Sequence, residues 1–154
     1  MEASKGTSIL VIGYGNPARR DDGIGEYVVK RLLSEKEYID VLSLQELGPE
    51  ICEDISGCEL VFFVDASMDQ SEDFIVKEII PRYKTPIFSH HISPEMLLAL
   101  TEELYGVRPK AYLVSIRGYD FDFGFELTEE ARKNSEEAIE KIKEICTNWL
   151  LQKI

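Results

Sequence analysis

Residues 9–25 read ILVIGYGNPARRDDGIG: a short apolar run, a glycine-rich turn and two adjacent aspartates. The apolar run at 9–12 is typical of a buried strand, and the glycines let the chain turn sharply at its carboxyl end. In an open α/β sheet, ligands bind at this end of the strands. The turn ends in Asp21 and Asp22 instead of the Gly-Lys pair that cradles phosphates, so we expect this edge of the sheet to suit a cation.

The composition is that of a globular domain with an acidic balance. The chain has 154 residues, of which 17 are basic and 29 acidic, giving a net charge of −12. We expect a single domain over residues 1–154, because this length builds one full core but not two. The negative charge disfavours nucleic acid and anionic membranes as partners. Neither a signal peptide nor a membrane-spanning run is recognisable, which predicts a cytoplasmic protein.

The three cysteines do not indicate a disulfide framework or a zinc site. Cys52, Cys58 and Cys146 are odd in number, widely spaced and without a CxxC arrangement. This pattern fits a reducing compartment. We expect all three side chains to pack in the core.

Strand-like and helix-like patterns alternate along the chain, which predicts an α/β fold with a largely parallel sheet. The most hydrophobic run, 60–64, is expected to form a central strand buried on both faces. Charged residues and a following proline make Phe74–Ile79 an edge strand. The other expected elements are strands at 8–13, 39–44 and 111–116 and helices at 24–33, 49–55, 94–105 and from 128 onward.

One segment, 118–125, has alternating aromatic side chains and no clear element type. Its aromatic residues are Tyr119, Phe121, Phe123 and Phe125. We expect them to cover the end of the core. Exposed aromatic side chains here would instead suit contact with a partner protein.

Polar side chains follow three of the predicted strands. They are Asp21 and Asp22 after the first, Asp65 after the third, and His90 and His91 after the fourth. With a strand order 2-1-3, Asp22 and Asp65 would face each other across the topological switch point of the sheet. Two carboxylates and an imidazole suit a divalent transition metal such as nickel or zinc. Alternatively, two close carboxylates act as a general acid and base.

Other interpretations of these residues stay open. The paired aspartates could simply cap the helix that starts near Gly23, and the adjacent histidines could lie on the surface. The stretch 13–18 formally matches the dinucleotide fingerprint G-x-G-x-x-A. Two aspartates at a helix start would repel a pyrophosphate, so nucleotide binding is disfavoured. An acidic scaffold without any site is a further alternative.

Taken together, the motifs resemble the hydrogenase maturation proteases, endopeptidases that trim the large subunit of [NiFe] hydrogenases. The resemblance is carried by the motifs GYGNPARRDDGIG at 13–25, LGPE at 47–50, FVDAS at 63–67 and SHHISPEMLL at 89–98. These motifs occur together and in order, and the resemblance fades only in the terminal helix.

The resemblance implies a three-layer αβα sandwich with a twisted, mostly parallel five-stranded sheet and a metal site at the strand ends. It places the three ligands, which are also the catalytic groups, on Asp22, Asp65 and His90. The choice of His90 over His91 follows from its distance to the Leu-Leu pair at 97–98. The family is classed as aspartic-type, although its members work by recognising a metal. A small specific protease of this kind can work as a monomer.

The resemblance also implies a substrate. It is the precursor of a [NiFe]-hydrogenase large subunit, cut after a conserved His or Arg once nickel has been inserted, so that its C-terminal extension is removed. The nickel then belongs to the precursor, and other divalent ions such as cadmium or zinc can occupy the same ligands. The alternative from another class is a non-catalytic nickel-binding chaperone or sensor that uses the same three side chains.

Overall fold

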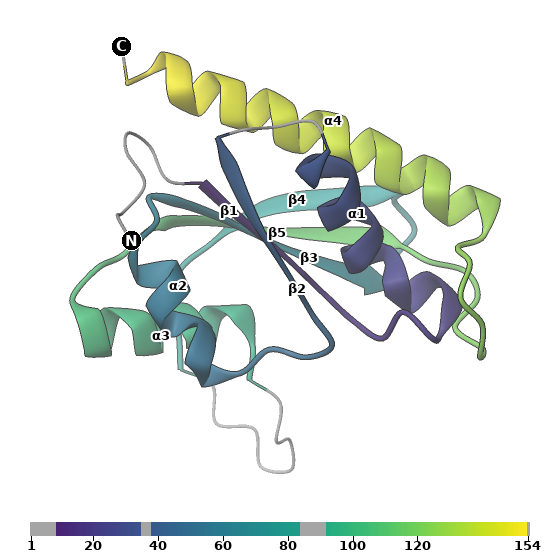
Figure 1. Ribbon diagram of the computed structural model, residues 1–154, viewed down its shortest axis with the longest axis horizontal. Coiled ribbons are helices and arrows are strands. Elements are labelled where there is room, and N and C mark those ends of the chain that lie inside the picture. The colour runs from purple at the N-terminus through teal and green to yellow at the C-terminus, as the bar shows by residue number, and fades with distance from the viewer. Residues whose placement is uncertain (1–8, 35–37, 84–91, 154) are drawn as a thin grey trace.

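The computed structural model describes residues 9–34, 38–83 and 92–153 (Figure 1). The strands are β1 (Ile9–Tyr14), β2 (Ile39–Leu44), β3 (Leu60–Ser67), β4 (Phe74–Ile79) and β5 (Lys110–Arg117). The helices are α1 (Ile24–Leu33), α2 (Cys52–Ser56), α3 (Pro94–Tyr105) and α4 (Glu129–Leu151). Short 3-10 helices at Arg20–Gly23 and Pro49–Ile51 lead into α1 and α2.

The strands form one twisted sheet in the order β2-β1-β3-β5-β4, which places β1 and β3 side by side (Figure 1). The pairs β1–β2, β1–β3 and β3–β5 are parallel, while β4 runs antiparallel to β5 at the edge. The 2-1-3 order that the sequence analysis assumed is therefore the observed one, and the edge position expected for Phe74–Ile79 is confirmed. The switch point lies between the carboxyl ends of β1 and β3.

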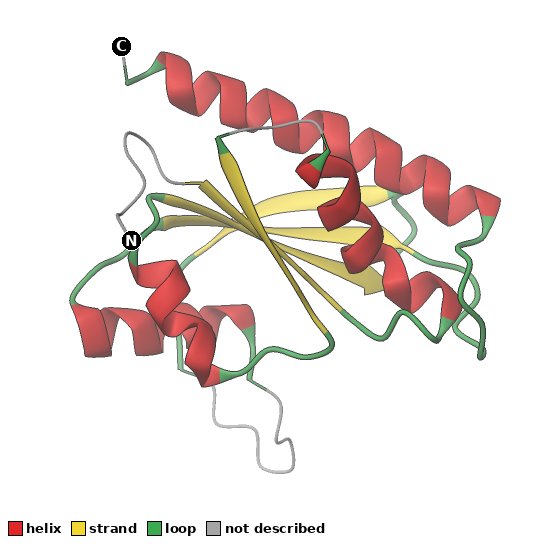
Figure 2. Cartoon of the chain, viewed as in Figure 1, coloured by secondary structure: helices red, strands yellow, loops and turns green. Residues whose placement is uncertain are grey.

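Helices cover both faces of the sheet, so the fold is the expected three-layer α/β arrangement (Figure 2). The core under α1 and α4 contains alternate strand residues such as Ile9, Val11 and Phe62, and the core under α2 and α3 contains Leu10, Ile12 and Phe63. Neighbouring strand residues thus point to opposite faces and both sets are buried.

The ends of α3 and α4 follow from local sequence signals. Ser93 caps α3 by accepting a hydrogen bond from Met96 N at 3.1 Å, and Thr128 caps α4 in the same way through Ala131 N. Gly106 ends α3 in the left-handed conformation, at φ 71°, which glycine adopts without steric cost. Within the described ranges, no helix is both long enough and apolar enough to span a bilayer.

Three sequence expectations need correction. β3 does not stop before Asp65 but continues to Ser67, because β5 offers it a hydrogen-bonding partner as far as Arg117. Phe123 and Phe125 do not cover the core; their side chains are exposed to solvent. Of the cysteines, Cys52 and Cys146 are buried in the two cores as expected, whereas Cys58 is only partly buried at the margin of one.

Candidate active site

The glycines of the first motif allow β1 and α1 to pack backbone against backbone. A Cβ atom on Gly13 would lie 2.2 Å from the carbonyl oxygen of Gly25, and one on Gly15 would lie 2.2 Å from that of Asp22. Gly15 also has φ 138°, in a region that other residues rarely adopt. The glycine spacing is thus required by close packing, and it fixes where the following aspartates lie.

Asp22 is held against the turn that precedes it. Its Oδ2 accepts a hydrogen bond from Asn16 N at 2.7 Å, and the side-chain oxygen of Asn16 in turn accepts one from Ala18 N at 2.9 Å. These bonds fix the carboxylate at the carboxyl end of β1. They also give the amide of Asn16 a partner, so this amide cannot bind a phosphate, which argues against the nucleotide interpretation.

Asp65 lies on β3, one strand away from the turn. Its carboxylate accepts hydrogen bonds from the hydroxyl of Tyr14 and from the backbone of Ala66. Burial and the nearby charge of Asp22 nevertheless raise the pKa of Asp65 to about 6, with the two hydrogen bonds acting in the opposite direction. Burial and Asp65 raise the pKa of Tyr14 well above its usual range, so its hydroxyl stays protonated as a donor.

The two carboxylates line one cavity of about 480 Å³ at the switch point of the sheet. The rest of the wall comes from the end of β1, the segment after β2 and the start of α3, with Tyr14, Gly15, Gln45, Glu46, Leu47, Ile92 and Pro94. The expectation that Asp22 and Asp65 meet at the switch point is thereby confirmed, whereas their role in catalysis stays a prediction. Ionised together, they concentrate negative charge where a cation would relieve their repulsion.

The third predicted ligand cannot be placed, because His90 and His91 lie outside the described residues. Ile92, where the described chain resumes, lines the same cavity as the two aspartates. Among residues 9–34, 38–83 and 92–153, no group of three His, Cys, Asp or Glu side chains is arranged to hold a metal. The assignment of His90 as the third ligand therefore stays a prediction.

Several solved structures with the same architecture are hydrogenase maturation proteases. The protease HycI from Thermococcus kodakarensis KOD1 is 26% identical, with a TM-score of 0.71 over 90% of this chain and 92% of that one. HybD from E. coli is 21% identical, with a TM-score of 0.69 over 88% and 90% of the two chains. A hydrogenase 2 maturation peptidase from a Thaumarchaeota archaeon is 20% identical, with a TM-score of 0.64 over 91% and 98%.

This chain has the fold of the [NiFe] hydrogenase maturation proteases. The resemblance that the sequence motifs indicated is thereby confirmed. No protein-family model matches the sequence, and no curated protein is significantly similar to it. The likeness is therefore far clearer in the arrangement of the strands and helices than in the residues as a whole.

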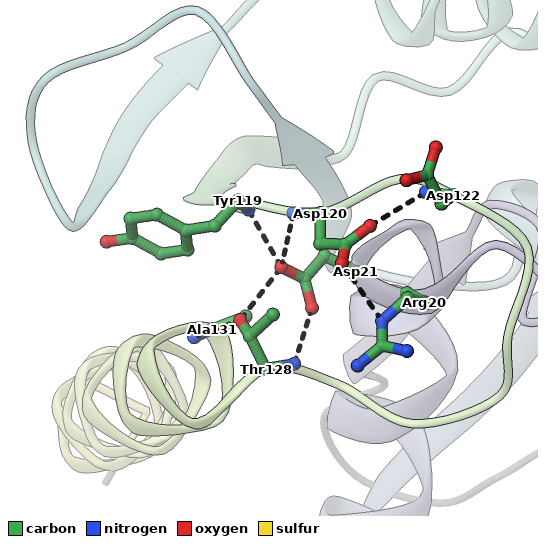
Figure 3. A network of polar contacts seen from close by, with 7 residues as sticks. All are labelled: Arg20, Asp21, Tyr119, Asp120, Asp122, Thr128 and Ala131. Carbon is green, nitrogen blue, oxygen red and sulfur yellow. Dashed lines mark hydrogen bonds and ion pairs between the residues drawn. The ribbon is translucent and has the colours of Figure 1, made fainter.

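Within this maturation-protease fold, Asp21 has a different environment from Asp22. Asp21 is fully buried, and its Oδ2 accepts hydrogen bonds from the amides of Tyr119 and Asp120 at 2.7 and 3.1 Å. Thr128 donates from its hydroxyl to Oδ2 at 2.9 Å and from its amide to Oδ1 at 2.8 Å (Figure 3). Asp21 therefore ties the loop after β5 and the start of α4 to the first motif.

The paired aspartates do not cap α1 through a side-chain hydrogen bond, although both lie in the first turn of the 3-10 helix that precedes it. The residue before α1 is Gly23, and no side chain accepts a capping hydrogen bond there or at the preceding 3-10 helix. Sequence reasoning also missed Tyr14, the residue that donates to Asp65. Its position at the end of β1, directly before the cavity, was the signal that could have identified it.

Proposed function

We propose that this protein is an endopeptidase that removes the C-terminal extension of a [NiFe]-hydrogenase large-subunit precursor after nickel insertion. Asp22, Asp65 and His90 would recognise the nickel that the precursor already carries. The observation that carries the proposal is the pair of carboxylates in one cavity at the switch point of a maturation-protease fold. The proposal extends from the neighbours' names, which describe maturation proteases and endopeptidases.

The electrostatics of the cavity support recognition of a cation. Asp65 holds a proton up to about pH 6 because of burial and the neighbouring charge of Asp22. A metal ion on the substrate would displace that proton and neutralise both carboxylates at once, so the binding of a nickel-loaded precursor would be favoured over that of an empty one. Imidazole from His90 would complete a set of oxygen and nitrogen donors that suits nickel.

The cleavage itself is a hydrolysis. A water molecule adds to the scissile carbonyl carbon, the C–N bond breaks, and the proton from the water passes to the leaving amine. We assign proton transfer to one of the two aspartates. The substrate's metal would act as a Lewis acid if it lies against the scissile carbonyl. Tyr14 would hold Asp65 in place through its hydroxyl, which makes Tyr14 a positioning residue.

The test is to incubate purified protein with nickel-loaded and nickel-free precursor and to measure the mass of the large subunit. We expect the wild type to shorten only the nickel-loaded form. Asp22→Asn and Asp65→Asn should lose this activity and keep the fold, whereas Asp69→Asn, an exposed aspartate just beyond β3, should keep both. Cleavage at the wild-type rate by either cavity variant would overturn the assignment.

The same assay separates the protease from the nickel-binding chaperone or sensor. A chaperone or sensor would bind nickel through the same ligands and leave the precursor at full mass. The pair His90→Gln and His91→Gln then identifies the third ligand. We expect only the substitution at His90 to abolish processing.

A further inference from the structure

Two aromatic side chains stand out on the surface of the loop between β5 and α4. Phe123 is 77% exposed and Phe125 is 76% exposed, the highest values among the large apolar residues that the structure describes. Their rings pack edge to face, with centroids 5.9 Å apart. Isolated apolar residues are common on surfaces, whereas adjoining exposed apolar side chains such as these two rings favour a binding surface.

The loop that carries these rings is fixed to the first motif. Gly124, which lies between them, donates its amide to Ala18 O and accepts from Arg20 N, both at 2.8 Å. Arg20 has φ 48°, an unusual conformation for a non-glycine residue, and this bridge holds it there. The buried carboxylate of Asp21 holds the beginning and the end of the same loop (Figure 3). The rings are thus presented on a preorganised support, which lowers the entropic cost of binding.

A groove of about 290 Å³ lies beside Phe125 and is lined in part by the same turn that lines the active-site cavity. Phe125 lines this groove, together with Pro17 and Gly23 of the first motif. Gly15 and Asp22, from the same turn, line the active-site cavity. The turn at 15–23 therefore separates the two hollows, and one substrate could contact both.

The charges around the groove differ from those of the whole chain. Its lining contains three basic side chains, Arg20, Lys30 and Arg132, and two acidic ones, Glu26 and Glu126. The whole chain has 17 basic and 29 acidic residues. Arg20 and Arg132 form surface ion pairs with Asp120 and Glu129, at 3.3 and 3.1 Å. Exposed pairs of this kind are weak, so a carboxylate on a partner segment that also carries an apolar side chain can replace either acidic partner.

We infer that Phe123, Phe125 and the adjoining groove dock the folded body of the protein substrate while its metal and scissile segment enter the cavity. This inference rests on the proposed function. The partner surface would present an apolar side chain to the groove, with a carboxylate beside Arg20 or Arg132. Docking outside the cavity would add affinity without taking part in the chemistry, because the rings do not line the cavity that contains Asp22 and Asp65.

The experiment compares the wild type with the double variant Phe123→Ser/Phe125→Ser. Processing kinetics are measured on the nickel-loaded precursor, and binding of the same precursor is measured separately on immobilised protein. We expect KM and the dissociation constant to rise about tenfold or more, while kcat changes less than about twofold. The matched control is Leu104→Ser/Leu151→Ser, which removes side chains of 61% and 59% exposure from α3 and α4 and should change nothing.

Each outcome decides for or against the docking surface. Unchanged KM and binding in the double variant overturn it, while processing by the wild type would still uphold the proposed function. If the wild type binds the precursor without cutting it, the proposed function fails, and loss of binding in the double variant alone still supports the surface. Concentration-dependent self-association of the wild type that the double variant lacks would instead assign the rings to a contact between two copies.

Two controls accompany the experiment. Equal thermal unfolding midpoints of the wild type and the double variant exclude misfolding. The variant Phe123→Leu/Phe125→Leu, which keeps apolar side chains, should retain part of the affinity for the precursor.

Discussion

Asp21 and Asp22 are adjacent in the sequence, but their carboxylates lie in different surroundings. One is surrounded by hydrogen-bond donors of the protein, and the other faces a cavity. The carboxylate of Asp21 is buried and accepts four hydrogen bonds from the loop after β5 and the start of α4. The carboxylate of Asp22 lines a cavity together with Asp65, whose pKa is raised by burial and by the charge of Asp22. The first region satisfies its charge within the protein, whereas the second leaves charge for something else to neutralise. This difference marks Asp21 as a structural aspartate and supports the proposal that Asp22 is a functional one.

The largest effect on stability should come from Asp21→Asn. The substitution removes the charge and turns an amide nitrogen toward groups that are themselves donors, so buried N–H groups lose their acceptor. We expect the free energy of unfolding to fall by about 3 to 5 kcal/mol. Urea unfolding followed by circular dichroism measures this. Asp22→Asn is the matched control, and equal losses in the two variants would remove the distinction between the regions.

Asp65→Asn is expected to raise the free energy of unfolding, whereas Asp21→Asn lowers it. A carboxyl group whose pKa is about 6 in the folded chain and near 4 when unfolded makes folding less favourable as the pH rises through that window. Asparagine cannot ionise and can still accept from Tyr14. At about pH 8 we therefore expect the variant to be more stable than the wild type by about 1 to 3 kcal/mol.

The pH dependence provides the control for this prediction. The advantage of Asp65→Asn should shrink as the pH falls from about 6 to about 4, because the wild-type carboxyl group then becomes neutral as well. Urea midpoints at several pH values test it. A variant that is less stable than the wild type at all of them would show that Asp65 is a structural residue like Asp21.

Thr128→Val is expected to lower the free energy of unfolding by less than Asp21→Asn does. The hydroxyl of Thr128 donates to Asp21 and accepts from Ala131 N at the start of α4, while its amide bond to Asp21 would survive the substitution. We expect about 1 to 2 kcal/mol of destabilisation, measured by urea unfolding. In an Asp21→Asn background the loss should fall to the cost of the missing cap of α4, about 1 kcal/mol, because only the bond to residue 21 is shared by the two substitutions. Full additivity of the two substitutions would contradict a shared network.

The sequence was sufficient to predict a parallel sheet and the two carboxylates that line the cavity, Asp22 and Asp65. The alternation of apolar runs and glycine-rich turns indicated a parallel α/β sheet, and the assumed order, with β1 beside β3, is the one that brings Asp22 to Asp65. The separate roles of Asp21 and Asp22 could not be predicted, because both follow the same turn. The groups that bind Asp21 lie 98 to 107 residues further along the chain, in a loop with no regular pattern.

The exposure of Phe123 and Phe125 could not be predicted from the sequence either. Alternating aromatic residues are typical of a half-buried strand, and only the tertiary contacts of Gly124 with the first motif show that this segment is a surface loop. Tyr14 was missed for a similar reason. Its side chain reaches Asp65 because β1 and β3 are neighbours, which is a consequence of topology and not of local pattern.

The most direct test of the shared charge at the cavity is an NMR titration of the Asp65 carboxyl carbon in the wild type and in Asp22→Asn. We expect Asp65 to titrate with a pKa of about 6 in the wild type and at a lower value once the charge of Asp22 is removed. A pKa near the ordinary value for aspartate in the wild type, unchanged by Asp22→Asn, would contradict the claim that the two carboxylates share one site.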